Sequence, residues 1–76
     1  MKAVLEFNLP EEESDFNLAC KGKDWWYVCW ELDQYLRGQL KYNDNISEDT
    51  REAYKDLRYE FLQIISDRNI SLDDVE

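Results

Sequence analysis

Six consecutive aromatic or apolar side chains, WWYVCW at residues 25–30, most restrict how this 76-residue chain can fold. They include all three tryptophans of the protein. From here to residue 42, apolar side chains recur at intervals of three and four residues, which is typical of an amphipathic helix. Because a helix turns by about 100° per residue, the run surrounds it on every side. One neighbouring element cannot cover all of that surface, so we expect part of it to meet another partner.

The charge of the chain restricts those partners. Acidic residues outnumber basic residues by 18 to 9, which gives a formal net charge of −9. This charge opposes direct binding to nucleic acid or to anionic membranes, and it favours a protein partner with a basic surface. The alternative is that the charge only keeps a small protein in solution. Hydrophobic residues make up 43% of the chain, enough to expect one small folded domain over residues 1–76.

The composition also argues against an enzyme. The chain has no histidine, which removes the commonest general base and the usual transition-metal ligand. Its two cysteines, Cys20 and Cys29, form no Cys-x-x-Cys motif, so we expect no metal site and no cofactor. Whether these thiols are ever oxidised stays open. The first residues do not read as a signal peptide and no segment has transmembrane length, so we expect a cytoplasmic protein without membrane contact.

Residues 2–9 show the two-residue alternation of a half-buried β-strand, which Pro10 ends. A lone strand leaves backbone donors and acceptors unpaired. It can pair with a short strand over residues 70–72, or with its own copy across a two-fold axis. The second arrangement predicts a homodimer.

Three helices follow the strand in the predicted order. Gly22 is the expected C-terminal cap of the first helix and Asp24 the N-cap of the second. A turn at residues 43–45 leads to the third helix, which Ser47 caps. These elements predict an α+β fold that is mostly α. The expected helices span residues 11–21, 25–42 and 48–68.

The middle helix combines a stripe that is expected to face the core with further aromatic side chains beside that stripe. Trp26 and Trp30 lie roughly a quarter to a third of a turn from the stripe. On the same flank Asp33 precedes Arg37 by four residues, the orientation that favours a helical ion pair. Tryptophan, tyrosine and arginine dominate binding hot spots, although both rings could instead pack in the core. The stripe expected to face the core is Trp25, Val28, Cys29, Leu32, Leu36 and Leu40. The predicted partner-binding residues are Trp26, Tyr27, Trp30, Asp33 and Arg37.

The same rings allow a second interpretation. With Arg37 and Lys41 nearby they could stack on a base and hold a phosphate, as in a protein that sequesters a nucleotide signal at a dimer interface. The chain lacks a glycine-rich phosphate loop, and its net charge opposes anions. This interpretation is therefore the weaker one.

The last helix carries a row of carboxylates on one face, with neighbours about 5–6 Å apart. The row could imitate DNA phosphates and steer the protein towards a basic surface. The alternative is an ordinary solvated helix face, and Arg51, Lys55 and Arg58 on the same helix dilute the negative field. The predicted acidic surface is Asp49, Glu52, Asp56 and Glu60.

Two segments resemble a known group. KAVLEFNLPE at residues 2–11 and VCWELDQYLR at residues 28–37 look like the opening and the middle helix of a recurrent group of small acidic proteins from tailed bacteriophages. The resemblance implies a viral protein of this size class in the host cytoplasm, and no mechanism. The tryptophan density at residues 25–30 departs from the usual pattern of that group.

Together these features predict a non-enzymatic phage accessory protein. We expect it to bind and modulate a protein of the bacterial host, such as a nucleic-acid-handling or defence enzyme, by analogy with small acidic phage inhibitors. Two alternatives stay open: a nucleotide-sequestering protein with an aromatic pocket, and a purely structural homo-oligomer.

Overall fold

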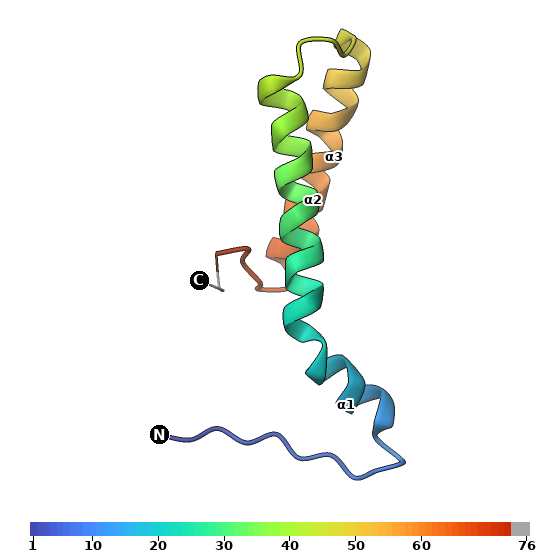
Figure 1. Ribbon diagram of the computed structural model, residues 1–76, viewed down its shortest axis with the longest axis vertical. Coiled ribbons are helices and arrows are strands. Elements are labelled where there is room, and N and C mark those ends of the chain that lie inside the picture. Colours follow the sequence, from blue (N-terminus) through green and yellow to red (C-terminus); the bar gives the residue numbers. More distant parts are fainter. Residues whose placement is uncertain (74–76) are drawn as a thin grey trace.

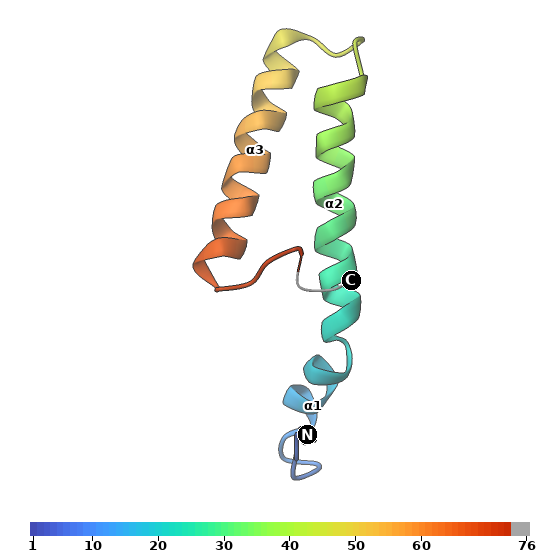
Figure 2. The same ribbon diagram turned by 90° about the vertical axis from the view of Figure 1, so that its left-hand side faces the viewer.

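Three helices form the framework of the computed structural model, which describes residues 1–73 (Figure 1). They are α1 (Glu13–Cys20), α2 (Gly22–Tyr42) and α3 (Glu48–Asp67). α2 and α3 run side by side in opposite directions as a helical hairpin, as both views show (Figure 2). α1 continues past the N-terminal end of α2, and an extended arm precedes it (Figure 1). The elongated chain measures 52 × 28 × 20 Å.

The predicted α+β fold is wrong, because the regular structure in residues 1–73 is entirely helical. The expected strand over residues 2–9 is an extended arm without a neighbouring strand to satisfy its backbone. Val4 and Leu5 of the arm are exposed, whereas Phe7 is half-buried with its ring 5.8 Å from that of Phe16, edge to face. Alternation alone therefore predicted an extended backbone here, but a sheet needs a partner strand that the described chain lacks.

The expected strand over residues 70–72 is also absent from the described chain, for a local reason. Asn69, which follows the C-cap residue Arg68 of α3, takes a left-handed conformation with φ of 57°. The Asn69 N–H donates to the Ser66 carbonyl at 3.0 Å, and the Ile70 N–H donates to the Ile65 carbonyl at 3.3 Å. This is the Schellman arrangement that closes a helix. It uses the Ile70 N–H, which a strand would have needed for its ladder.

The junction between α1 and α2 differs from the expected cap. The first helix begins at Glu13 rather than at residue 11, after a turn in which the Glu12 N–H donates to the Asn8 carbonyl at 2.8 Å. Lys21 is the single residue between the two helices. Gly22 has no positive φ and opens α2, so it does not cap α1, and Asp24 lies inside the first turn of α2. The chain turns at Lys21 without needing a left-handed residue.

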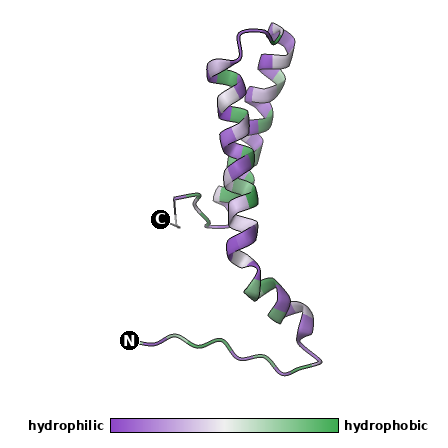
Figure 3. Ribbon diagram, in the orientation of Figure 1, coloured by the Kyte–Doolittle hydropathy of each residue, from purple (hydrophilic) through white to green (hydrophobic). Residues whose placement is uncertain are grey.

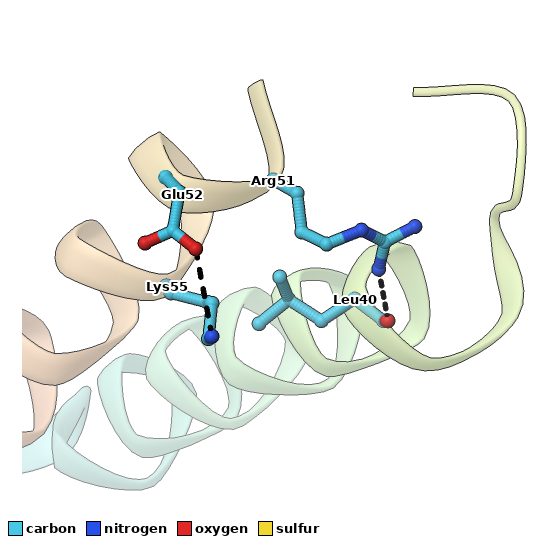
Figure 4. Close-up of polar contacts among 4 residues, drawn as sticks. All are labelled: Leu40, Arg51, Glu52 and Lys55. Carbon is cyan, nitrogen blue, oxygen red and sulfur yellow. Dashed lines mark hydrogen bonds and ion pairs between the residues drawn. The ribbon is translucent and has the colours of Figure 1, made fainter. Parts of the chain in front are cut away.

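The connection between α2 and α3 is tied by polar contacts. The Ser47 hydroxyl accepts the Thr50 N–H at 3.1 Å, which confirms the predicted N-cap. The Asn45 N–H donates to the Asn43 side chain at 3.0 Å. The Arg51 guanidinium of α3 donates to the Leu40 carbonyl (Figure 4) and, at 3.0 Å, to the Asn43 carbonyl. A helix C-terminus leaves carbonyls without internal partners, and Arg51 satisfies two of them.

The chain buries few apolar side chains. Within residues 1–73, Leu36 is the buried apolar residue and Asp33 the buried charged one. The chain exposes 6804 Å², whereas a compact protein of 9.2 kDa exposes about 4,900 Å². Its radius of gyration is 17.1 Å, against about 11 Å for a compact domain of this length. Hydrophobic segments also occur in α1 and the arm, outside the hairpin (Figure 3). The core of the single chain is therefore incomplete.

Candidate interaction surface

Asp33 forms the central polar contact between the two long helices. Its Oδ1 atom accepts a hydrogen bond from Arg58 Nε of α3 at 2.9 Å, and its side chain is nearly buried. The spacing of the sequence predicted an ion pair with Arg37 on the same helix, and within residues 1–73 the structure records none from Arg37. Asp33 therefore holds α2 to α3, and it is not available to a partner on the surface.

Trp26 is the second residue of the predicted flank that packs inside the chain. It is half-buried, and its indole N–H donates to the Ser71 carbonyl at 3.4 Å. The Trp26 ring stacks on Trp30, with centroids 6.4 Å apart and planes 19° from parallel. It also meets Tyr27 edge to face, at 5.0 Å. Trp26 thus links the C-terminal segment to the two rings that follow it along α2.

Tyr27, Trp30 and Arg37 remain on the surface. Each of them follows a residue that is buried or half-buried against α3 or the C-terminal segment. A step of one residue turns about 100° around the helix, so the three side chains lie on one common side of α2. We call Tyr27, Trp30 and Arg37 the aromatic flank. Of the five predicted binding residues, the structure keeps these three exposed together.

Some of the residues that the periodicity assigned to the core are exposed in the structure. Trp25, Val28 and Leu32 were expected to face the core, but the structure exposes them by 58%, 55% and 42%. α2 carries two ladders of side chains with the same three- and four-residue spacing, offset by one residue. One ladder starts at Trp25 and the other at Trp26. Spacing alone cannot tell which of the two ladders faces α3. From the sequence, the exposed ladder that starts at Trp25 was therefore only one of two candidates for an exposed surface.

Two hollows flank the C-terminal segment. The smaller has a volume of about 180 Å³ and a mostly apolar lining, and the larger has about 420 Å³ and includes Asp33 and Asp73. Arg37 and Lys41, the cations expected to hold a phosphate, line neither hollow. Neither hollow therefore combines the aromatic rings with the cations that the nucleotide interpretation requires. The smaller hollow is lined by Gly22, Trp25, Trp26, Cys29, Ile65, Ile70 and Leu72.

The predicted acidic surface lies on the outer side of α3. All four carboxylate side chains, those of Asp49, Glu52, Asp56 and Glu60, are exposed. Three basic residues of α3 were expected to dilute the negative field of this surface. Two of them, Arg51 and Arg58, turn towards α2, and Lys55 alone of the three pairs with it, at 3.7 Å from Glu52 (Figure 4). The acidic row is therefore less diluted than the sequence suggests.

Among residues 1–73, no three cysteine or carboxylate side chains are grouped so that they could hold a metal ion. None of the helices in this part of the chain combines the length and apolarity needed to cross a bilayer. Comparisons with protein-family models, with curated proteins and with solved structures find no match to this chain. The aromatic flank and the acidic surface are therefore the features that bear on function.

Proposed function

We propose that this chain is a non-enzymatic accessory protein of a tailed bacteriophage that binds and modulates a protein in the cytoplasm of its bacterial host. The observation that carries the proposal is the exposure of Tyr27 and Trp30, at 44% and 40%, in a chain that buries so few apolar side chains of its own. Large aromatic rings beside an arginine are the usual anchors of protein interfaces, because they bury much area with little loss of conformational entropy.

The acidic surface of α3 supplies the second part of the proposal. Its exposed carboxylates would attract a partner with a basic surface over several ångströms and raise the rate of encounter. The aromatic flank would then provide the buried contacts that slow dissociation. Proteins that handle nucleic acid carry such basic surfaces, which is why this class of host protein fits best.

Affinity capture from a bacterial lysate tests the proposal. We expect the wild-type chain to retain a host protein in stoichiometric amount and Trp30→Ala to lose it, while far-ultraviolet circular dichroism shows that the variant is folded at the assay temperature. Leu18→Ala is the control, because Leu18 is an exposed apolar residue of α1, outside the hairpin that carries the flank. Equal retention by Trp30→Ala and the wild type would contradict the role of the flank.

The salt dependence of the captured complex tests the acidic surface separately. Glu52→Lys combined with Asp56→Lys should weaken binding and flatten its dependence on ionic strength, since screening acts on exposed charges. An affinity that does not change with salt would contradict electrostatic steering while leaving the aromatic flank in place.

A further inference from the structure

A second apolar surface lies on the hairpin, apart from the aromatic flank. On α2 it follows alternating steps of three and four residues, the repeat by which one helix packs along another. On α3, Leu57 and Ile64 are exposed seven residues apart, and Tyr54 and Phe61 lie half-buried beside them. We call this surface the heptad face. Its members are Trp25, Val28, Leu32, Tyr35, Gln39 and Tyr42 of α2, with Tyr54, Leu57, Phe61 and Ile64 of α3.

Both halves of the heptad face lie on the same side of the hairpin. On α2, Leu32 stands one residue before Asp33, and on α3, Leu57 stands one residue before Arg58, the two residues that bond across the helix pair. On each helix, the residue one position earlier points about 100° away from the residue that bonds across the pair. Because the helices run in opposite directions, these two rotations lead to the same side of the pair. The two helices therefore present their apolar side chains, with Gln39 as a polar member, on one side of the pair rather than as two separate stripes.

The described residues 1–73 leave this surface open except at Trp25, which lines the smaller hollow beside Ile70 and Leu72. Its C-terminal segment crosses the opposite side of the hairpin (Figure 2), where Ser71 accepts the Trp26 indole N–H. On that side Ser66, one residue after the α2-facing Ile65, lines the larger hollow together with Leu72. The aromatic flank lies on that side too, since Trp30 is one residue after Cys29. The heptad face is thus the open side of a two-helix layer.

Charge and area indicate what covers the heptad face. None of its ten positions is acidic, although 18 of the 76 residues are Asp or Glu. The repulsion between two chains of net charge −9 is therefore kept away from this contact. The chain exposes about 1,900 Å² more than a compact protein of its mass. The arm and α1 contribute to this excess, but two copies that buried half of it would still share about 1,900 Å², the size of a stable protein interface.

We infer that the protein is a homodimer in which two hairpins pack their heptad faces together as a four-helix bundle. A two-fold axis places the same apolar surface on both copies, so each face finds a complementary one without any other partner. Four helices around a shared core are the usual way for two-helix layers to bury one apolar side each. The bundle leaves the aromatic flank and the acidic surface on the outside. This inference goes beyond the proposed function and uses a different surface.

The mass of the wild-type chain in solution is the first test. Light scattering coupled to size exclusion should give twice the 9.2 kDa of the chain. The thermal midpoint should rise with protein concentration, since association stabilises by mass action. A mass of one chain, with the same midpoint over about a hundredfold range of concentration, would overturn the inference.

Two matched substitutions on α3 locate the interface. Ile64 and Tyr59 are 62% and 63% exposed in the single chain, but only Ile64 belongs to the heptad face. Ile64→Glu should raise the dissociation constant of the dimer by about 100-fold or more, whereas Tyr59→Glu should change it by less than about threefold. Equal effects would overturn the proposed geometry. If Ile64→Glu does not fold, Leu32→Gln against Lys41→Gln on α2 makes the same comparison with a milder change, because Lys41 is exposed outside the heptad face.

The outcomes separate this inference from the proposed function. A wild-type monomer that captures a host protein through Trp30 overturns the dimer and leaves the proposed function standing. A dimer broken by Ile64→Glu that captures nothing supports the bundle and contradicts host binding. A foreign protein that protects Leu32 and Ile64 from solvent, with no second copy present, would also overturn the dimer.

Discussion

The two ends of the α2–α3 hairpin differ in how completely the chain satisfies its own groups. At the loop end, Ser47 caps α3 and Arg51 donates to the last carbonyls of α2. At the other end, Trp25 and Val28 are more than half exposed and α1 has no buried residue. The polar groups of the loop end are thus paired within the chain, whereas the apolar groups of the open end are not.

Helix capping and apolar burial thus differ in whether a small chain can complete them alone. A helix cap needs only residues a few positions apart, so Ser47 caps α3 without a contribution from distant parts of the chain. Burial of an apolar face needs a second surface of similar size, and the described residues 1–73 do not supply one for the heptad face. Oligomerisation is a usual solution for chains with too small a core.

Breaking the contact between α2 and α3 should have the largest effect. Arg58→Ala leaves the nearly buried Asp33 carboxylate without its partner, and we expect a loss of about 2–4 kcal/mol in the free energy of unfolding. Lys55→Ala is the matched control, since it breaks the exposed 3.7 Å pair with Glu52 and should cost less than about 0.5 kcal/mol. Urea unfolding at one fixed protein concentration measures both, and similar losses would contradict the distinction between them.

Opening the loop end should have an intermediate effect. Arg51→Ala removes the hydrogen bonds to the Leu40 and Asn43 carbonyls, and we expect a loss of about 1–2 kcal/mol in the free energy of unfolding. Glu52→Ala, at the next position and on the exposed side of α3, serves as the control in the same urea titration. If Arg51→Ala were no more destabilising than Glu52→Ala, the loop end would not be tied as described.

Removing part of the arm should have the smallest effect on the free energy of unfolding, because the arm lies at the open end of the molecule. Deletion of residues 2–6 leaves the contact between Phe7 and Phe16, so we expect the free energy of unfolding to change by less than about 0.5 kcal/mol. Thermal unfolding followed by circular dichroism measures this change. A loss as large as that of Arg51→Ala would mean that the arm packs on a second copy and belongs to the closed part of the molecule.

Several features of the fold could be predicted from the sequence because they depend on neighbours along the chain. The helical character is confirmed, as is the Ser47 cap of α3. The cap expected at Gly22 was wrong, since Lys21 makes the turn between α1 and α2 without a left-handed residue. Both strands were wrong for related reasons. The arm has no strand beside it, and the Ile70 N–H is used to close α3.

The candidate site was predictable only in part, because its residues sit on a helix with two equivalent ladders. The sequence identified the aromatic run at residues 25–30 and the surplus of surface that it creates. It could not tell that Asp33 bonds to Arg58, or that Trp26 turns towards Ser71. Those contacts leave Tyr27, Trp30 and Arg37 outside, and they rotate Trp25, Val28 and Leu32 out of the core.

The length, the charge, the helical periodicity and the Ser47 cap of this protein follow from the sequence alone. Each of these follows from composition or from residues within a few positions of one another. The side of α2 that meets α3 is known only from the tertiary structure. That side determines which apolar surface is left for a second molecule. That choice depends on contacts between residues far apart in the chain, such as Asp33 and Arg58, and no local pattern encodes their direction.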